Sequence, residues 1–229
     1  AEVHKVHSEA PVPVGWCSWY HFYTDINEQV IQSNLKSVVN LRPDVPLPLF
    51  QIDDGFETYP SDWFDFTPGF PKGLAHLAQK IKAAGLTPGI WLAPFIVHPK
   101  AKLVKDHPDW LLRDKKDRPV NAGFVWNRFN FALDLTHPEA LAYTQKVIRT
   151  AVEQWGFSYL KLDFLYAAAL KGCYQDPTKT RAQVLRMGLE ALREAAGPEI
   201  TLLGCGCPLG TGVGIFEAMR ISADVSGYW

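Results

Sequence analysis

Short, almost continuously apolar runs alternate along the chain with longer segments in which apolar residues recur every three or four positions. Runs of the first kind are typical of strands buried on both faces of a parallel sheet, and the longer segments are typical of helices that cover such a sheet. Their alternation predicts parallel βαβ units. We predict strands over six ranges: Val14 to Trp19, Leu49 to Asp53, Pro88 to Pro94, Tyr159 to Phe164, Ile200 to Cys205 and Met219 to Asp224.

The segments between these runs carry helical spacing and helix punctuation. Thr136-His-Pro-Glu139 has a capping-box pattern with proline at an early helical position, and Gly156 marks the stop of that helix. Pro177 and Gly197 bracket the last helix. We predict helices over Glu28 to Leu41, Leu74 to Ala84, Pro138 to Trp155 and Thr178 to Ala196.

Two connections depart from the simple alternation. The stretch from Ile96 to Leu135 is longer than an ordinary βα connection, so we expect an excursion with its own short strand around Phe129 to Leu135, which could wall a site. The stretch from Pro208 to Phe216 is rich in glycine and too short for a long helix. It predicts an irregular crossover or one short turn.

The predicted fold class is α/β, a TIM-type (β/α) barrel that forms a single domain over residues 1–229. A closed barrel of this type has eight strands, whereas about six units are predicted here, so the barrel is incomplete. An expressed fragment, a natural split protein completed by another chain, and closure by self-association all explain this. Because open parallel edges are prone to aggregation, an oligomer or a barrel-completing partner is favoured.

Two of the predicted strands end in a carboxylate that follows a cation. Lys161 lies two residues before Asp163, and Arg220 lies four residues before Asp224. In an extended strand this even spacing places each cation and its acid on one face. Barrels of this type keep their active sites at the carboxyl ends of the strands. Two acids in that place, beside fixed cations, indicate a glycosidase.

Composition narrows the class of partner. The formal charge of −1 favours neither nucleic acid nor an anionic membrane, so a neutral small molecule fits better. Eight Trp and eight Tyr supply rings that suit sugar faces, although core packing explains most of them equally well. No run reaches membrane-spanning length, and the first residues lack the apolar core of a signal peptide, so we expect a cytoplasmic protein.

No metal or cofactor is expected. The spacing of Cys17, Cys173, Cys205 and Cys207 fits neither a disulfide scaffold nor a zinc ribbon, so reduced thiols are predicted. No histidine pair has a zinc-protease spacing, and the glycines between 204 and 214 match neither a phosphate loop nor a dinucleotide fingerprint.

Several motifs occur in order from about Val12 to Trp229 and together carry a family resemblance. The chain resembles the α-galactosidases of glycoside hydrolase family 36, the melibiase-like enzymes, over the catalytic barrel portion. Neither the N-terminal β-sandwich nor the C-terminal β-domain of such enzymes is seen. The motifs are Gly15-Trp-Cys-Ser-Trp-Tyr-His21, Gln51-Ile-Asp-Asp-Gly55, Gly89-Ile-Trp-Leu-Ala-Pro-Phe95, Lys161-Leu-Asp163, Gly204-Cys-Gly-Cys-Pro208 and Arg220-Ile-Ser-Ala-Asp224.

The resemblance implies a retaining, double-displacement mechanism with Asp163 as nucleophile and Asp224 as the acid that later becomes the base. Retention predicts that the two carboxyl groups lie roughly 5 to 5.5 Å apart. Lys161 would favour the ionised nucleophile, or serve only as a structural ion-pair partner. Burial and the neighbouring negative charge would keep Asp224 protonated. We therefore expect Arg220 to aim at substrate hydroxyls or at the nucleophile, and not to pair with Asp224.

The same resemblance assigns the substrate-binding residues. Asp53 and Asp54 would accept hydrogen bonds from the axial and primary hydroxyls of galactose, although Asp-Asp-Gly alone is also good turn chemistry. Trp19, Tyr20 and Trp91 match positions around the galactose ring. Cys205 matches a position near the C2 side of the sugar, with a packing role as the alternative.

Two functions follow. One is a retaining α-galactosidase that acts on melibiose- or raffinose-type galactosides, with transglycosylation or N-acetylgalactosamine specificity as open variants. The other is a non-catalytic or partner-completed barrel fragment that binds sugar or assembles with another chain. Both catalytic acids are present, which favours the enzyme.

Overall fold

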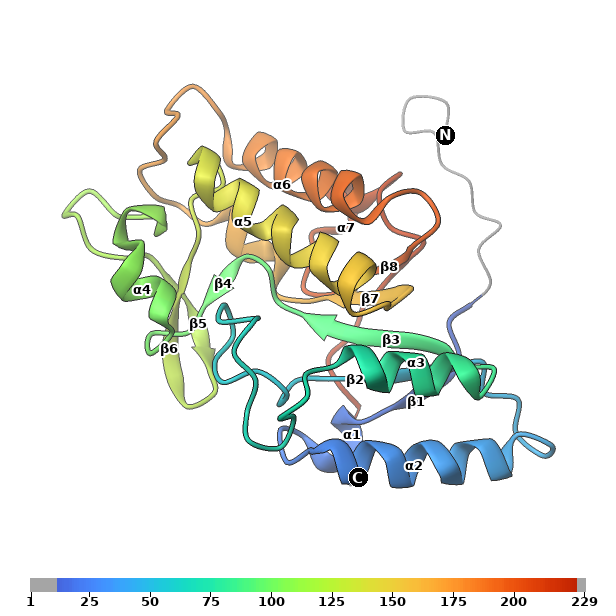
Figure 1. Ribbon diagram of the computed structural model, residues 1–229. Helices are drawn as coiled ribbons and strands as arrows, with labels where there is room; N and C mark the ends of the chain where they lie inside the picture. Colours follow the sequence, from blue (N-terminus) through green and yellow to red (C-terminus); the bar gives the residue numbers. More distant parts are fainter. Residues whose placement is uncertain (1–11, 226–229) are drawn as a thin grey trace.

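The computed structural model describes residues 12–225 (Figure 1). The expectations for the first residues and for the last residues of the single domain lie outside this range. Within it, no helix is both long enough and apolar enough to cross a membrane.

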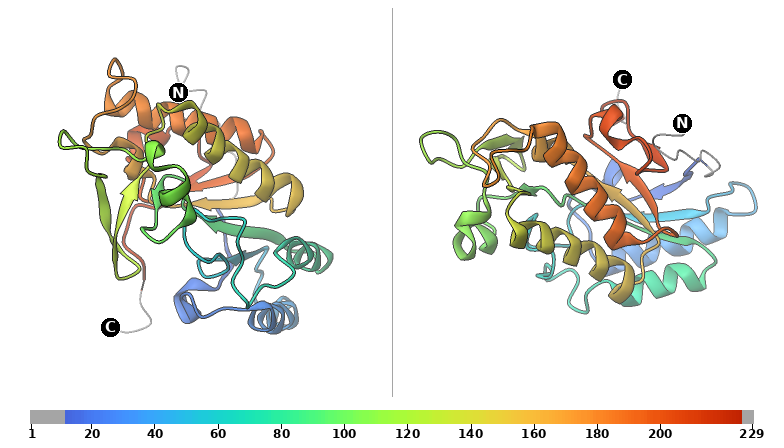
Figure 2. Two further views of the ribbon diagram at one scale, coloured as in Figure 1. Left: turned by 60° about the vertical axis from the view of Figure 1, so that its left-hand side comes forward. Right: turned by 90° about the horizontal axis from the view of Figure 1, so that it is seen from above.

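A parallel sheet of six strands curls into part of a barrel (Figure 2). The strand order is β1-β2-β3-β7-β8-β9, and every neighbouring pair is parallel. This confirms the predicted incomplete TIM-type barrel. The strands are β1 (Gly15–Cys17), β2 (Leu49–Ile52), β3 (Thr87–Leu92), β7 (Tyr159–Leu162), β8 (Thr201–Gly204) and β9 (Ala218–Met219).

Helices follow one another around the outer side of the curled sheet (Figure 2). Helix α2 adjoins α3, and α5 adjoins α6. Their apolar faces are buried, as with Ile31, Leu35 and Val38 of α2, which explains why apolar spacing predicted these helices. The long helices are α2 (Glu28–Leu41), α3 (Ala75–Ala83), α5 (Pro138–Arg149), which continues as the π-helical turn η3 (Thr150–Gln154), and α6 (Arg181–Ala196).

The predicted helix stops are confirmed, but the predicted capping box is wrong. Gly156 and Gly197 have φ values of 86° and 81°, in the left-handed region that favours glycine. At the start of α5 the Asp134 carboxylate accepts both the N–H and the hydroxyl of Thr136, so His137 caps the helix instead. A capping box does occur at Thr180 and Gln183, where α6 begins.

The long excursion after β3 is confirmed and holds a small antiparallel sheet in the order β4-β6-β5. Its strands are β4 (Ile96–Val97), β5 (Asn121–Val125) and β6 (Arg128–Ala132). Trp126 and Asn127 form the β5–β6 turn with φ values of 53° and 55°, the geometry of a tight two-residue hairpin turn. The excursion stands beyond the carboxyl ends of the main strands (Figure 1).

The remaining helices are single turns. They are α1 (Trp19–Phe22), α4 (Lys102–Asp106), the 3-10 turns η2 (Pro108–Trp110) and η4 (Leu165–Ala169), and α7 (Leu209–Gly212), which confirms the short turn predicted between residues 208 and 216.

The first and last predicted strands are shorter than expected. Strand β1 ends at Cys17, so Trp19 belongs to α1. Strand β9 ends at Met219, and the last sheet hydrogen bond runs from Arg220 N to Gly204 O. The parity argument for Arg220 and Asp224 is therefore wrong, because those residues lie past the strand. For Asp163 it holds, because Asp163 N still donates to Leu92 O and continues the β7 ladder.

Candidate active site

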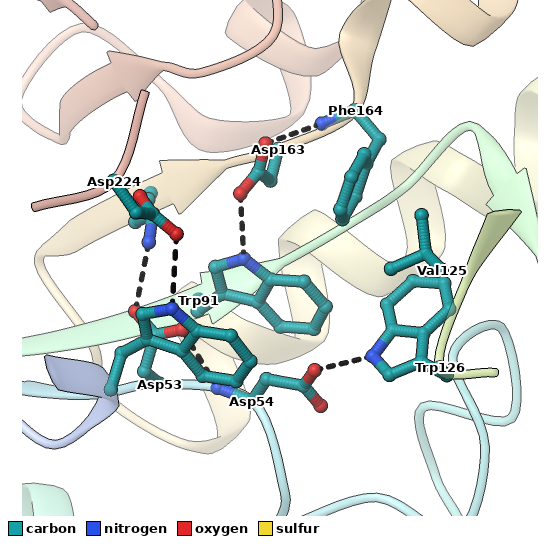
Figure 3. Close-up of a pocket in the computed structure, with 10 residues that line it drawn as sticks. Asp53, Asp54, Trp91, Val125, Trp126, Asp163, Phe164 and Asp224 are labelled. Atoms are coloured by element: carbon teal, nitrogen blue, oxygen red, sulfur yellow. Dashed lines mark hydrogen bonds and ion pairs between the residues drawn. The ribbon is translucent and has the colours of Figure 1, made fainter. Parts of the chain in front are cut away.

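A cavity of about 300 Å³ opens where the carboxyl ends of the strands meet (Figure 3). Its walls come from the ends of β1, β2, β3 and β7, from the segment after β9, and from the β5–β6 hairpin. The predicted residues Tyr20, Cys205 and Arg220 lie outside the lining. The lining residues are Trp19, Asp53, Asp54, Trp91, Val125, Trp126, Lys161, Asp163, Phe164 and Asp224.

The buried lining residues Asp53, Asp54 and Lys161 form the floor of the cavity, and Asp53 is only 1% exposed. Its Oδ2 accepts hydrogen bonds from Gln51 Nε2 at 2.5 Å, Lys161 Nζ at 3.1 Å and Cys17 Sγ at 3.4 Å. Its Oδ1 accepts the Asp54 N–H at 3.0 Å. Because Oδ1 is less heavily engaged than Oδ2, it is the oxygen better able to accept a further donor from the cavity.

Lys161 is the buried cation of the floor. Burial opposes its charge, but Asp53 and then Asp163 outweigh this effect and raise the pKa of Lys161 above its ordinary value. Lys161 therefore stays charged. Its direct partner is Asp53, so the structural ion-pair reading of Lys161 holds, while the field of its charge also reaches Asp163.

Asp54 is bound differently from its neighbour. Trp126 Nε1 donates to its Oδ2 at 2.6 Å (Figure 3), and no cation among residues 12–225 forms an ion pair with it. Burial raises the pKa of Asp54 to about 6, while contacts with Glu57 and Trp126 act in the opposite direction. Asp54 is thus ionised at neutral pH but close to its protonated form.

Asp163 directly follows β7 and is oriented by two N–H groups. Trp91 Nε1 donates to its Oδ2 at 3.1 Å, and the Phe164 backbone N–H donates to its Oδ1 at 2.7 Å. Phe164 has a φ of 52°, a left-handed conformation that is uncommon for a bulky residue and that recurs at functional sites. The Cys205 thiol lies beside Asp163, and burial together with that carboxylate raises the pKa of Cys205 to about 12.

Asp224 lines the same cavity from the segment after β9 and is half-exposed. Arg220 Nη2 donates to its Oδ1 at 2.8 Å, and Trp19 Nε1 donates to its Oδ2 at 3.0 Å. Two expectations are therefore wrong. Arg220 does pair with Asp224, and burial does not enclose that carboxylate, whose side chain is 48% exposed. The physical reason is that the chain has left the sheet after Met219, which frees both side chains to meet.

Side chains bridge the two edges of the sheet. Trp19 and Tyr20 follow the edge strand β1, whereas Arg220 and Asp224 follow the other edge strand, β9. Besides the bond between Trp19 and Asp224, Arg220 Nη1 donates to the Tyr20 hydroxyl at 3.1 Å. The curl of the sheet thus brings the ends of β1 and β9 within side-chain reach across the cavity.

Sequence reasoning missed Val125, Trp126 and Phe164 as lining residues, and Gln51 and Cys17 as partners of Asp53. A signal existed for Trp126, because Trp-Asn lies between two strand-like runs where a two-residue turn fits. Among residues 12–225, no group of three potential ligands is arranged to hold a metal ion, and no cysteine forms a disulfide.

Comparison with known proteins settles the family. A model of the Melibiase family matches residues 2–190. The chain belongs to the melibiase family. This membership confirms the resemblance to family 36 α-galactosidases that its motifs carry.

Several relatives of this melibiase chain are named α-galactosidases. "Alpha-galactosidase Mel36A" of Lactobacillus acidophilus is 31% identical over 158 residues, which are 66% of this chain and 20% of that protein. "Alpha-galactosidase" of Escherichia coli is 28% identical over 193 residues, which are 80% and 26% of the two chains. This chain therefore spans about a fifth to a quarter of the length of these relatives.

Among solved structures, TtGalA, an α-galactosidase from Thermus thermophilus, superimposes with a TM-score of 0.88 and 40% sequence identity. The match covers 98% of this chain and 44% of the Thermus chain. The family model ends at residue 190, so it includes Asp53, Asp54, Lys161 and Asp163 but not Asp224. The TtGalA match extends over almost the whole melibiase chain.

Proposed function

We propose that this chain carries the galactoside-binding cavity of a retaining α-galactosidase and hydrolyses terminal α-galactosyl groups by double displacement. The observation that carries this proposal is the presence of Asp163, directly after β7, and Asp224, in the segment after β9, on one cavity of about 300 Å³. Membership of the melibiase family supports the reaction class.

In the first step, the ionised Asp163 attacks the anomeric carbon and the bond from that carbon to the leaving oxygen breaks. Asp224 gives its proton to the departing oxygen. The N–H donors of Trp91 and Phe164 hold the Asp163 carboxylate toward the cavity, so little rotational freedom is lost on attack. The proposed product is a covalent galactosyl ester on Asp163 and a free alcohol.

In the second step, Asp224 takes a proton from water, the oxygen of that water bonds to the anomeric carbon, and the ester bond to Asp163 breaks. Two inversions give net retention. If a sugar hydroxyl replaces the water, the same step produces transglycosylation. The carboxyl separation of roughly 5 to 5.5 Å stays a prediction of this mechanism.

Arg220 donates a hydrogen bond to Asp224, an arrangement that suits the proton acceptor needed in the second step. The first step needs the protonated acid. We therefore propose that an entering sugar draws Arg220 away from Asp224, and Tyr20, which already contacts Arg220, offers it a second partner. The ion pair between Lys161 and Asp53 needs no such exchange of partners, because the charge of Asp53 is already neutralised before substrate arrives.

The proposed substrates are galactosides. TtGalA has been solved in complex with p-nitrophenyl α-D-galactopyranoside and in complex with stachyose. In this chain, Asp53 and Asp54 would accept the axial and primary hydroxyls of galactose, and the Trp19 ring would cover an apolar face of the sugar. Trp91 is only 3% exposed and holds Asp163, so we assign it to orienting the nucleophile more than to stacking.

Hydrolysis of p-nitrophenyl α-galactoside tests the proposal. Asp163→Ala should abolish turnover, because no covalent intermediate can form. Asp224→Ala should keep partial activity on this substrate, since its leaving group needs little protonation. Asp44→Ala, at an exposed position in the connection before β2, is the matched control and should be unchanged. Turnover by Asp163→Ala at the wild-type rate would refute the assignment.

The second candidate is a non-catalytic or partner-completed barrel fragment that binds sugar or assembles with another chain. It is favoured by the sheet edges, because β1 and β9 each have one strand neighbour among the described residues. A sizing column with the galactosidase assay on every fraction separates the candidates. Activity in the monomer peak supports the first, whereas activity confined to larger species supports completion by a partner or a second copy.

A further inference from the structure

Glu57 is a buried acid three residues after Asp54. The residue is 4% exposed, and its backbone pairs with Phe66 in an antiparallel bridge that holds it in place. Both side-chain oxygens are inaccessible, and no side-chain N–H or O–H donor among residues 12–225 reaches them with hydrogen-bond geometry. A buried carboxylate in that state would be costly, so its protonation state needs a physical explanation.

The partner of Glu57 is another carboxyl group. Glu57 and Asp54 both line a second cavity, and each carboxyl group affects the pKa of the other. Ionised carboxylates only accept hydrogen bonds, so this arrangement is favourable only when one of the two acids carries a proton. Trp126 Nε1 donates to Asp54, and the charge of Lys161 also favours ionised Asp54. The shared proton therefore belongs on Glu57.

The other groups around the pair agree with this placement. Burial, and then the charge of Asp54, raise the pKa of Glu57 well above its ordinary value. His98 lines the same second cavity, of about 650 Å³. Burial, and then the cations Lys100 and Arg128, lower its pKa, so it supplies no positive charge at neutral pH. The remaining charges near Asp54 are Asp53 and its ion-pair partner Lys161.

We propose that Glu57 is a positioning residue that stays protonated, donates its hydroxyl hydrogen to Asp54, and so holds Asp54 ionised and aimed at the sugar cavity. Asp53 has a cation of its own, and a second buried cation would be needed to hold Asp54 in the same way. A neutral acid supplies the hydrogen bond without adding charge. This inference rests on the proposed function in one respect, that Asp54 accepts a galactose hydroxyl.

Infrared spectroscopy with 13C-labelled glutamate tests the proton directly and needs no activity. At pH 7.5, the wild-type chain should show the C=O band of a protonated glutamic acid, and Glu57→Gln should lose it. Asp62→Asn, which changes another buried acid outside the cavity, should leave the band in place. The proposal would be overturned if the wild-type spectrum lacked this band, or if Glu57→Gln kept it unchanged.

Calorimetric titration with D-galactose tests the positioning role. The amide introduced by Glu57→Gln can still donate to Asp54, so this variant should bind within about threefold of wild type. Glu57→Leu keeps the bulk but loses the donor, and should bind ~10- to 100-fold more weakly. Wild-type affinity should fall at high pH, where Glu57 ionises, whereas Glu57→Gln should lack this loss.

A packing role alone gives a different result. Equal galactose affinity for folded Glu57→Leu and Glu57→Gln would overturn the positioning role. If Glu57→Leu does not fold, the fall of galactose affinity at high pH is compared between wild type and Glu57→Gln. The same fall in both would contradict the proposal. If no form of the chain binds galactose, the proposed function fails, while the infrared band still decides where the proton lies.

Discussion

Lys161 and Arg220 each pair with an aspartate of the same cavity, but the two pairs belong to opposite parts of the sheet. The side chains of Lys161 and Asp53 are 5% and 2% exposed and come from the interior strands β7 and β2. Those of Arg220 and Asp224 are 20% and 48% exposed and follow the edge strand β9. Strand neighbours on both sides fix the backbone of the first pair, whereas the second is held mainly by side-chain bonds.

This difference separates two tasks within one site. The buried floor would present fixed charge to the proposed sugar, and rearranging it would leave a charge without a partner in a water-poor environment. The side chains that join the two sheet edges, Arg220 and Asp224 with Trp19 and Tyr20, form an exposed bridge. Arg220 and Asp224 can exchange partners at little cost in free energy, because water solvates either ion. The proposed acid and base has to change its protonation during each cycle, so its place on the exposed side suits its role.

The largest expected contrast comes from removing each cation. Lys161→Met leaves Asp53 buried without a counter-ion and should lower the free energy of unfolding by about 3 to 5 kcal/mol. Arg220→Met leaves the half-exposed Asp224 in contact with water and should change it by less than about 1 kcal/mol. Urea denaturation of both variants measures the difference.

Equal losses of stability in Lys161→Met and Arg220→Met would contradict the proposed difference between the floor and the bridge. The two substitutions are matched in chemistry, since each replaces a long cation with the same flexible apolar side chain. A Lys161→Arg variant sharpens the test, because it keeps the charge but places a larger, planar head group at a buried position. It should recover only part of the lost stability.

A smaller effect is expected from the two adjacent floor acids. The pKa of Asp54 is raised from 3.8 to about 6, so its contribution to stability is complete below pH 3.8 and is lost as the pH rises through 6. Asp54→Asn removes that loss and should be more stable than wild type at pH 7.5 by on the order of 2 to 3 kcal/mol, with no gain at pH 3.5. Thermal unfolding at both pH values measures this.

Asp53→Asn should be less stable than wild type at pH 7.5, because it leaves Lys161 buried without its anion. A stabilised Asp53→Asn, or an Asp54→Asn gain that is the same at both pH values, would show that the two acids do not differ as their contacts indicate. The gain from Asp54→Asn should come with weaker galactose binding if Asp54 serves the sugar.

One part of the site could be predicted from the sequence because its geometry follows from strand periodicity. Lys161 and Asp163 share a face through the β7 ladder, which continues as far as the Asp163 N–H. The bridge could not be predicted, since β9 ends at Met219 and periodicity says nothing about a chain that has left its sheet. Trp126 was missed for a related reason, because a hairpin turn far along the chain delivers it to Asp54.

The smallest expected effect concerns the bridge itself. Trp19→Phe keeps an aromatic ring but removes the N–H that donates to Asp224 at 3.0 Å. Because this bond is exposed, the free energy of unfolding should change by less than about 1 kcal/mol. The turnover number on p-nitrophenyl α-galactoside should fall a few-fold while KM stays near wild type, because the ring still covers the sugar. A rise in KM with unchanged turnover would instead mean that Trp19 serves the sugar alone, and that the hydrogen bond across the open side of the sheet does nothing to aim Asp224.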